Sequence, residues 1–153
     1  MSKKRNEWAP LPLRLILGGS FMAAGFLKLV PPGGPGYQNI VHELTAFGVP
    51  MSEGVGWIVG IVEFSSGLAL VVGALVRILS AFNALQLLGL LFIGMVRGGI
   101  PEALPDLQFF PYQLPGYHLS ILTLGGLLAL LISGAGAYSV DGFLAARRAD
   151  TTS

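Results

Sequence analysis

The chain has 153 residues, of which 53% are hydrophobic and 11% are charged, and its net charge is +1. Soluble domains carry about 25% charged residues, so this composition excludes a water-soluble protein and indicates one that lies in lipid. The absence of cysteine excludes disulfides, thiol nucleophiles, cysteine-ligated iron–sulfur clusters and covalent c-type haem. The near-neutral charge provides no field to attract nucleic acid, and the sequence contains no nucleotide-binding glycine loop.

The apolar residues gather into four segments, each close to the roughly 20 residues that cross a hydrocarbon core of about 30 Å. They predict transmembrane helices over about residues 11–30, 55–76, 78–96 and 118–138. Arg77 is expected to begin the short turn between the second and third helices, and residues 139–153 are expected to form a polar tail. The fold class expected is all-α, an integral membrane four-helix bundle forming one domain over residues 1–153.

Two loops are expected at the membrane surface opposite the termini. Residues 37–47 place their apolar side chains on one side at near-helical spacing. This segment is too short to span, which predicts an interfacial helix. Residues 98–117 contain four prolines and a group of aromatic residues typical of the bilayer interface, namely Phe109, Phe110, Tyr112 and Tyr117.

The distribution of lysine and arginine predicts the orientation. With four helices, both termini and the turn at Arg77 share one side of the membrane. Seven of the nine Lys and Arg residues belong to that side, whereas Lys28 and Arg97 belong to the other. Because cytoplasmic loops are enriched in lysine and arginine, both termini are expected in the cytoplasm.

Glu63 is the residue most expected to mark a site. It lies well inside the second apolar segment, where a carboxylate costs about 2.5–3.5 kcal/mol to insert. Three roles remain open for it: an ion pair that fixes helix packing, ligand binding, and proton transfer. Lys28, near the outer end of the first helix, is the natural partner, although its long side chain can also extend to the headgroups.

The other polar residues of the apolar segments are expected to have lesser roles. Arg14 lies near the cytoplasmic end of the first helix and is expected to extend its side chain to the interface. Asn83 and Gln86 are three residues apart on one helix face and are expected to bridge helices. The two histidines, His42 and His118, have no defined metal-ligand spacing, so a hydrogen bond from either one to a quinone headgroup is expected in preference to a metal or haem site. Lys28, Glu63 and His118 are therefore the candidate intramembrane polar site.

The order of these features resembles the DoxX family of small bacterial four-helix membrane proteins. The resemblance is carried by Arg14 with GGSFMAAGFLKL (Gly18 to Leu29), FGVP (Phe47 to Pro50), VGIVEFSSGLALVVGALVR (Val59 to Arg77) and GAGAYSVDGFL (Gly134 to Leu144). The family is related to the DoxD membrane subunit of thiosulfate:quinone oxidoreductase. The resemblance implies a multi-pass protein of the bacterial inner membrane that acts as a redox-linked, quinone-interacting subunit. The alternative is a non-catalytic scaffold or accessory subunit of a larger respiratory or photosynthetic complex.

Overall fold

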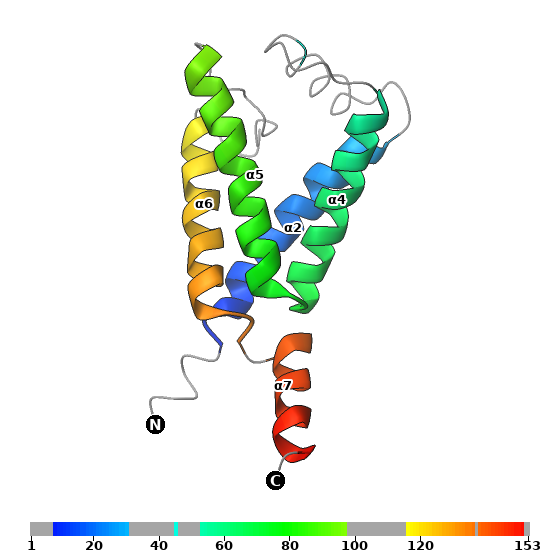
Figure 1. Ribbon diagram of the computed structural model, residues 1–153, viewed down its shortest axis with the longest axis vertical. Helices are drawn as coiled ribbons and strands as arrows, with labels where there is room; N and C mark the ends of the chain where they lie inside the picture. The colour runs from blue at the N-terminus through cyan, green and yellow to red at the C-terminus, as the bar shows by residue number, and fades with distance from the viewer. Residues whose placement is uncertain (1–7, 31–44, 46–52, 98–115, 137, 152–153) are drawn as a thin grey trace.

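The computed structural model describes residues 8–30, 45, 53–97, 116–136 and 138–151. These residues form five helices and no strand (Figure 1): α2 (Pro10–Leu29), α4 (Glu53–Val72), α5 (Val76–Arg97), α6 (Gly116–Ser133) and α7 (Val140–Thr151). The all-helical prediction is confirmed. The predicted interfacial helix over residues 37–47 and the loop aromatics Phe109, Phe110 and Tyr112 lie outside the described residues.

The lengths and the apolar surface of the helices suit a bilayer. A helix of 20 residues, the length of both α2 and α4, is about 30 Å long, which matches the hydrocarbon core. Pro10–Leu29 and Gly54–Val72 are long and apolar enough to cross a membrane, and α5 and α6 contain shorter apolar stretches, Val76–Phe92 and Leu119–Ser133. Large apolar side chains remain exposed on the outside of all four helices, among them Ile16, Ile58, Leu85 and Leu122, as expected where lipid replaces water.

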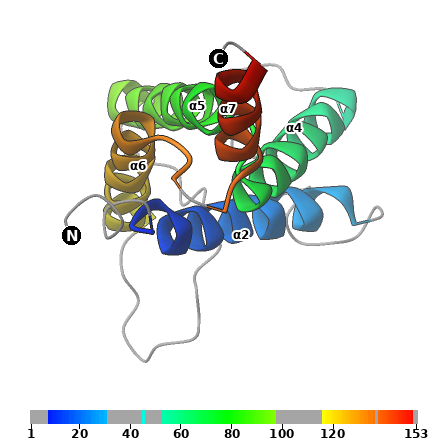
Figure 2. The same cartoon turned by 90° about the horizontal axis from the view of Figure 1, so that it is seen from below.

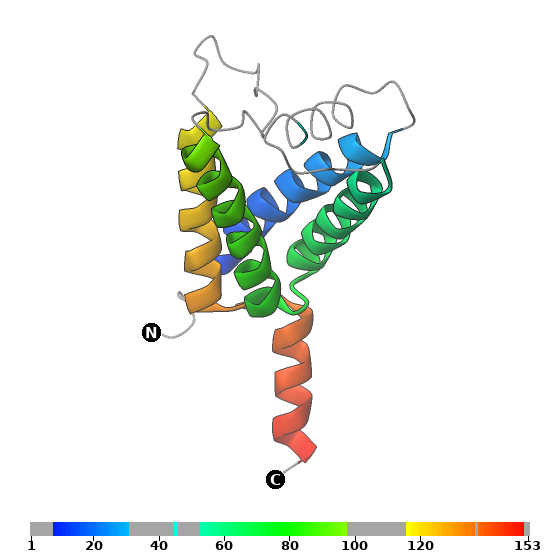
Figure 3. The same ribbon diagram turned by 45° about the horizontal axis from the view of Figure 1, so that its top comes forward.

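The four helices enclose a shared core. Seen from the α7 end (Figure 2), α2 and α5 lie on opposite sides of the bundle, with α4 and α6 between them. Each of the four contributes fully or nearly fully buried apolar side chains to one cluster, which consists of Leu17, Leu70, Val76, Ala84, Leu127 and Leu130. Figure 3 shows α2 with α4 and α5 with α6 as two pairs that diverge from the α4–α5 turn. The cluster therefore holds the two pairs together at one end of the bundle.

Glycines bring α2 and α4 into backbone contact. A Cβ atom built on Gly25 would lie 2.3 Å from the Phe64 backbone nitrogen, and one on Gly67 would lie 2.5 Å from the Met22 backbone nitrogen. No side chain fits at such distances. Because helices in lipid associate through close packing rather than through a hydrophobic effect, these contacts make α2–α4 the tight pair of the bundle.

The α4–α5 turn differs in position from the sequence prediction. α4 ends at Val72 instead of Val76, and Arg77 lies in the first turn of α5 instead of in the loop. Gly73 has φ +76°, and the bonds Gly73 N to Leu70 O (3.1 Å) and Ala74 N to Ala69 O (2.8 Å) close α4 with the left-handed glycine motif that commonly ends helices. The apolar pattern continues through this turn, which is why hydrophobicity alone placed the boundary too late.

The carboxyl-terminal segment, expected as a polar tail, contains a helix that the sequence did not predict, α7. α6 ends at Ser133 rather than near Tyr138, because Gly134 (φ +78°) and Gly136 (φ +69°) turn the chain. The Ser139 Oγ then accepts a hydrogen bond of 3.0 Å from the Gly142 backbone nitrogen, an N-cap that starts α7. α7 extends away from the bundle (Figure 1).

Candidate functional site

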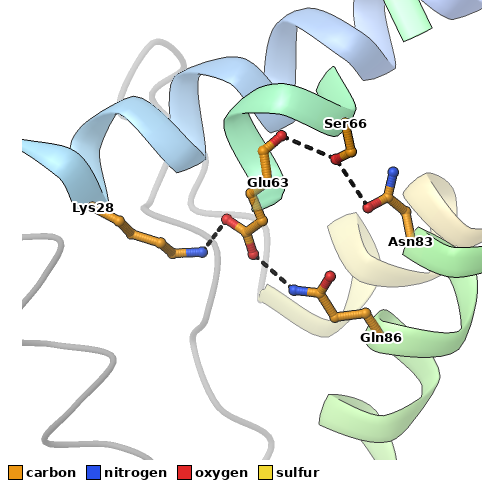
Figure 4. A network of polar contacts seen from close by, with 5 residues as sticks. All are labelled: Lys28, Glu63, Ser66, Asn83 and Gln86. Carbon is orange, nitrogen blue, oxygen red and sulfur yellow. Dashed lines mark hydrogen bonds and ion pairs between the residues drawn. The ribbon is translucent and has the colours of Figure 1, made fainter. Parts of the chain in front are cut away.

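Lys28 and Glu63 meet inside the bundle, as the sequence predicted. The Lys28 Nζ donates a hydrogen bond to the Glu63 Oε2 (Figure 4). Lys28 is 9% exposed and Glu63 is 7% exposed. Two opposite charges withdrawn from solvent need each other, since either one alone would remain buried and uncompensated.

Glycine positions the lysine. Lys28 lies in the last turn of α2, where a side chain at Gly60 of α4 would contact it, since a Cβ there would be 3.0 Å from the Lys28 Cβ. The missing side chain lets the Lys28 stem lie against α4 and direct its amine toward Glu63, three residues further along that helix. The alternative interpretation, in which Lys28 extends to the headgroups, does not hold in this structure.

Helix α5 supplies the other partners of Glu63. Gln86 Nε2 donates to Glu63 Oε1 over 2.9 Å, so both carboxylate oxygens accept hydrogen bonds. Ser66 Oγ lies 3.0 Å from the Glu63 backbone oxygen and 3.3 Å from Asn83 Oδ1. The prediction that Asn83 and Gln86 bridge helices is confirmed. Lys28, Glu63, Ser66, Asn83 and Gln86, drawn in Figure 4, are called the Glu63 site below.

Three buried polar atoms on α5 have no hydrogen-bond partner within the described part of the chain. They are Ser80 Oγ, Asn83 Nδ2 and Gln86 Oε1. Such an atom in a low-dielectric interior costs on the order of 1–3 kcal/mol, which favours a ligand or water at these positions. The sequence reasoning missed Ser66 and Ser80. Their spacing was the available signal, because Ser66 follows Glu63 by three residues and Ser80 precedes Asn83 by three.

Arg14 is buried at the other end of α2, so the expectation that it extends to the interface is wrong. It is 1% exposed, and its guanidinium donates to the carbonyl oxygens of Leu70 (3.2 Å), Val71 (3.1 Å), Tyr138 (3.2 Å) and Ala135. The first two carbonyls belong to the last turn of α4, and the Leu70 oxygen also accepts the hydrogen bond from the Gly73 backbone nitrogen. The several N–H donors of the guanidinium let one side chain bind carbonyls of α4 and of the segment between α6 and α7 at the same time.

Asp141 completes this end of the bundle. Its two carboxylate oxygens accept hydrogen bonds from the backbone nitrogens of Leu75 (2.8 Å) and Val76 (3.0 Å), which caps the start of α5. Its own backbone nitrogen donates to Gly73 O over 3.1 Å. Arg14 and Asp141 thus join α2, the α4–α5 turn and α7. Arg14 lies fourteen residues from Lys28, about 21 Å along α2, and does not contribute to the Glu63 site.

The remaining candidates are not placed with the Glu63 site. His118 lies in the first turn of α6, but its side chain is outside the described residues, as is all of His42. Within the described ranges, no three His, Cys, Asp or Glu residues gather in a way that holds a metal ion. The Glu63 site therefore offers hydrogen bonds and charge: an ammonium, a carboxylate and two amides at the meeting of three helices.

The chain was compared with known proteins. The DoxX family model matches residues 9–95, the part that contains α2, α4 and most of α5. The Inner membrane protein YqjF of Escherichia coli (strain K12) is 31% identical over 145 residues, which is 93% of this chain and 96% of that protein. No solved structure matches the chain. The matched region contains Lys28, Glu63, Asn83 and Gln86, and the similarity to the relative extends over nearly the whole of both proteins. The chain belongs to the DoxX family of membrane proteins.

Proposed function

We propose that this DoxX protein is a redox-linked membrane subunit that binds a quinone headgroup at the Glu63 site. The observation that carries the proposal is the set of unpartnered polar atoms around a buried ion pair, since binding sites for small amphipathic molecules combine apolar walls with a few convergent polar groups. A charged residue within a membrane helix marks such a site by default.

The hydrogen-bonding capacity of the site suits both forms of the ligand. A quinone presents two carbonyl oxygens, which accept hydrogen bonds from a lysine ammonium or an amide N–H. Lys28 Nζ carries three N–H donors, one of which is directed at Glu63, and Asn83 Nδ2 has no partner among the described residues. A quinol presents hydroxyls, which can donate to the unpartnered Gln86 Oε1. The apolar tail of such a ligand would lie in lipid.

The test is binding of a short-chain quinone analogue to the protein purified in mild detergent. We expect the wild type to carry quinone extractable by organic solvent, and its melting temperature to rise with added analogue. The double variant Glu63→Leu with Lys28→Met should abolish both effects while the protein stays folded, because both charges of the buried pair are removed together and neither stays buried without compensation. Ser65→Ala is the matched control, since Ser65 lies two residues away on α4 but faces outward. A wild type with no quinone and no thermal shift would refute the proposal.

The second candidate function is that of a non-catalytic accessory subunit. It is favoured by α7, which extends away from the bundle with Phe143 58% exposed and Leu144 48% exposed. A helix of 12 residues is marginally stable in water on its own, so a covering protein surface would stabilise it. Native mass spectrometry of the protein released from membranes in mild detergent distinguishes the two functions. A bound protein subunit that is lost when Phe143 and Leu144 are both changed to serine, with Asp141 left in place, supports this second function.

A further inference from the structure

Four polar residues of α5 follow one another at intervals of three: Arg77, Ser80, Asn83 and Gln86. Residues three apart form an inclined ridge on a helix, so this row crosses the inward face of α5 diagonally. At its lower end, the guanidinium of Arg77 lies beside Gly134, directly after α6. At its upper end, Gln86 contacts Glu63 of α4. The row therefore joins the Arg14 end of the bundle to the Glu63 site.

The row is buried in its middle and its hydrogen bonds are incomplete. Ser80 and Asn83 are each 0% exposed, and Ser80 Oγ, Asn83 Nδ2 and Gln86 Oε1 have no partner among the described residues. Successive members are separated by a rise of about 4.5 Å, a gap that one water molecule with hydrogen bonds of about 2.8 Å on each side can bridge. Buried water in proteins occupies positions of this kind, where several polar groups lack other partners.

The lower end of the row opens to a cavity. A cavity of about 520 Å³ lies where the α4–α5 turn, the end of α6 and the start of α7 meet, and Arg77, Ser133 and Asp141 are among its lining residues. Ser80 follows Arg77 by three residues, about one turn further into the bundle. Figure 3 shows α4 and α5 diverging from this turn.

We infer that the Ser80–Asn83–Gln86 row holds a file of water molecules that connects the cavity at the Arg14 end of the bundle with Glu63 and lets its carboxylate exchange protons with that side of the membrane. A proton that arrives along the file forms an O–H bond on Glu63, and the last water molecule is left neutral by the transfer. Of the side chains that hydrogen-bond to Glu63 in this structure, Lys28 is the titratable one. This proton route rests on the proposed function, because it leads to the same site and quinone reduction consumes protons. The route itself is tested without quinone.

The first experiment uses the absence of native cysteine. Single cysteines at Ser80 and Asn83 are compared with cysteines at their neighbours Ala81, which faces outward, and Ala84, which is buried in the apolar core. The reagent is a small water-soluble methanethiosulfonate, added to protein in liposomes. Only a hydrated thiol forms the reactive thiolate, so Ser80→Cys and Asn83→Cys should react at least about tenfold faster than Ala81→Cys and Ala84→Cys. Equal, slow rates at all four positions would overturn the water file. Ser80→Cys replaces only the Oγ atom with sulfur and should fold, so its labelling rate tests the water file even if Asn83→Cys does not fold.

The second experiment follows the proton. After a rapid drop in pH, the infrared carbonyl band of protonated Glu63, assigned by its loss in Glu63→Gln, is recorded in the wild type and in Asn83→Leu. Interrupting the file should slow the appearance of the band by about tenfold, equivalent to about 1.4 kcal/mol in the barrier. Ala81→Leu, which introduces the same side chain on the outward face of α5, should leave the rate unchanged. An unchanged rate in Asn83→Leu, or no band at any pH at which the protein is folded, would overturn proton delivery. Failure of quinone binding would leave both results standing, so the two proposals are separable.

Discussion

The Lys28–Glu63 pair can be tested by a double-mutant cycle. Lys28→Met keeps the apolar stem of the lysine but removes the ammonium, so the Glu63 carboxylate keeps Gln86 Nε2 as its side-chain donor. Breaking a buried pair in this way costs about 3–5 kcal/mol, because one charge stays buried without compensation. Since Lys28 and Glu63 are only 9% and 7% exposed, solvent screens little of this cost. The single change Glu63→Gln should also destabilise the protein, because it leaves the Lys28 ammonium buried without its carboxylate partner.

The double variant, Lys28→Met with Glu63→Gln, carries no buried charge and should recover about 2–3 kcal/mol relative to the sum of the single changes. The assay is reversible unfolding in mixed micelles by increasing the fraction of denaturing detergent, followed by tryptophan fluorescence. Leu27→Met is the matched control, because it introduces the same side chain at the lipid-facing neighbour and should change stability little. Single effects that add to within about 0.5 kcal/mol would show that the two side chains do not interact, which would refute the arrangement in Figure 4.

Three further predictions address packing, the Arg14 end and topology. Gly25→Ala should destabilise the bundle by about 1–3 kcal/mol in the same unfolding assay, because its Cβ would lie 2.3 Å from the Phe64 backbone nitrogen. Gly19→Ala is the control: its Cβ would meet nothing within 4 Å, so it should be neutral or stabilising. Equal effects of the two changes would contradict the close α2–α4 contact. Arg14→Met should lower the free energy of unfolding by several times the roughly 1 kcal/mol of an ordinary hydrogen bond. Arg14→Lys should restore only part of that loss, since lysine lacks the forked guanidinium, and full restoration by lysine would show that the charge alone matters. Impermeant thiol labelling of intact cells should modify the outer positions and spare the termini, and the reverse pattern would overturn the predicted orientation; the single cysteines replace Ser2, Ser52, Gln108 and Ser153.

The sequence was sufficient for the fold class and for the centre of the site. Glu63 and Lys28 are recognisable because an isolated charge within an apolar segment is expensive, and a cost of that size requires a partner at a matching depth. Asn83 and Gln86 were identified for the same reason. Helix ends were predicted less well, since α4 and α6 both stop within apolar sequence where glycines with positive φ turn the chain. Backbone conformation, not hydrophobicity, sets those boundaries.

Arg14 and α7 show what one sequence without a structure conceals. The position of Arg14 near a helix end is compatible both with an interfacial side chain and with a buried one. The choice depends on the carbonyls of residues that lie 56 to 124 positions away, such as Leu70 and Tyr138. α7 likewise has too few apolar residues for its pattern to stand out, and its start depends on the cap at Ser139. Both features are determined by contacts between distant parts of the chain.

The bonds of Arg14 to Ala135 and Tyr138 also impose an order on biosynthesis. The ribosome completes the first helix long before residue 135 exists, and the 121 positions that separate Ala135 from Arg14 take on the order of ten seconds to synthesise. During that interval the guanidinium has only lipid headgroups, water and the α4 carbonyls to satisfy it, so a newly inserted α2 holds Arg14 near the membrane surface. Burial of Arg14 is consequently among the last steps of assembly. A chain released before residue 135 would therefore lack two of the four carbonyl acceptors of Arg14.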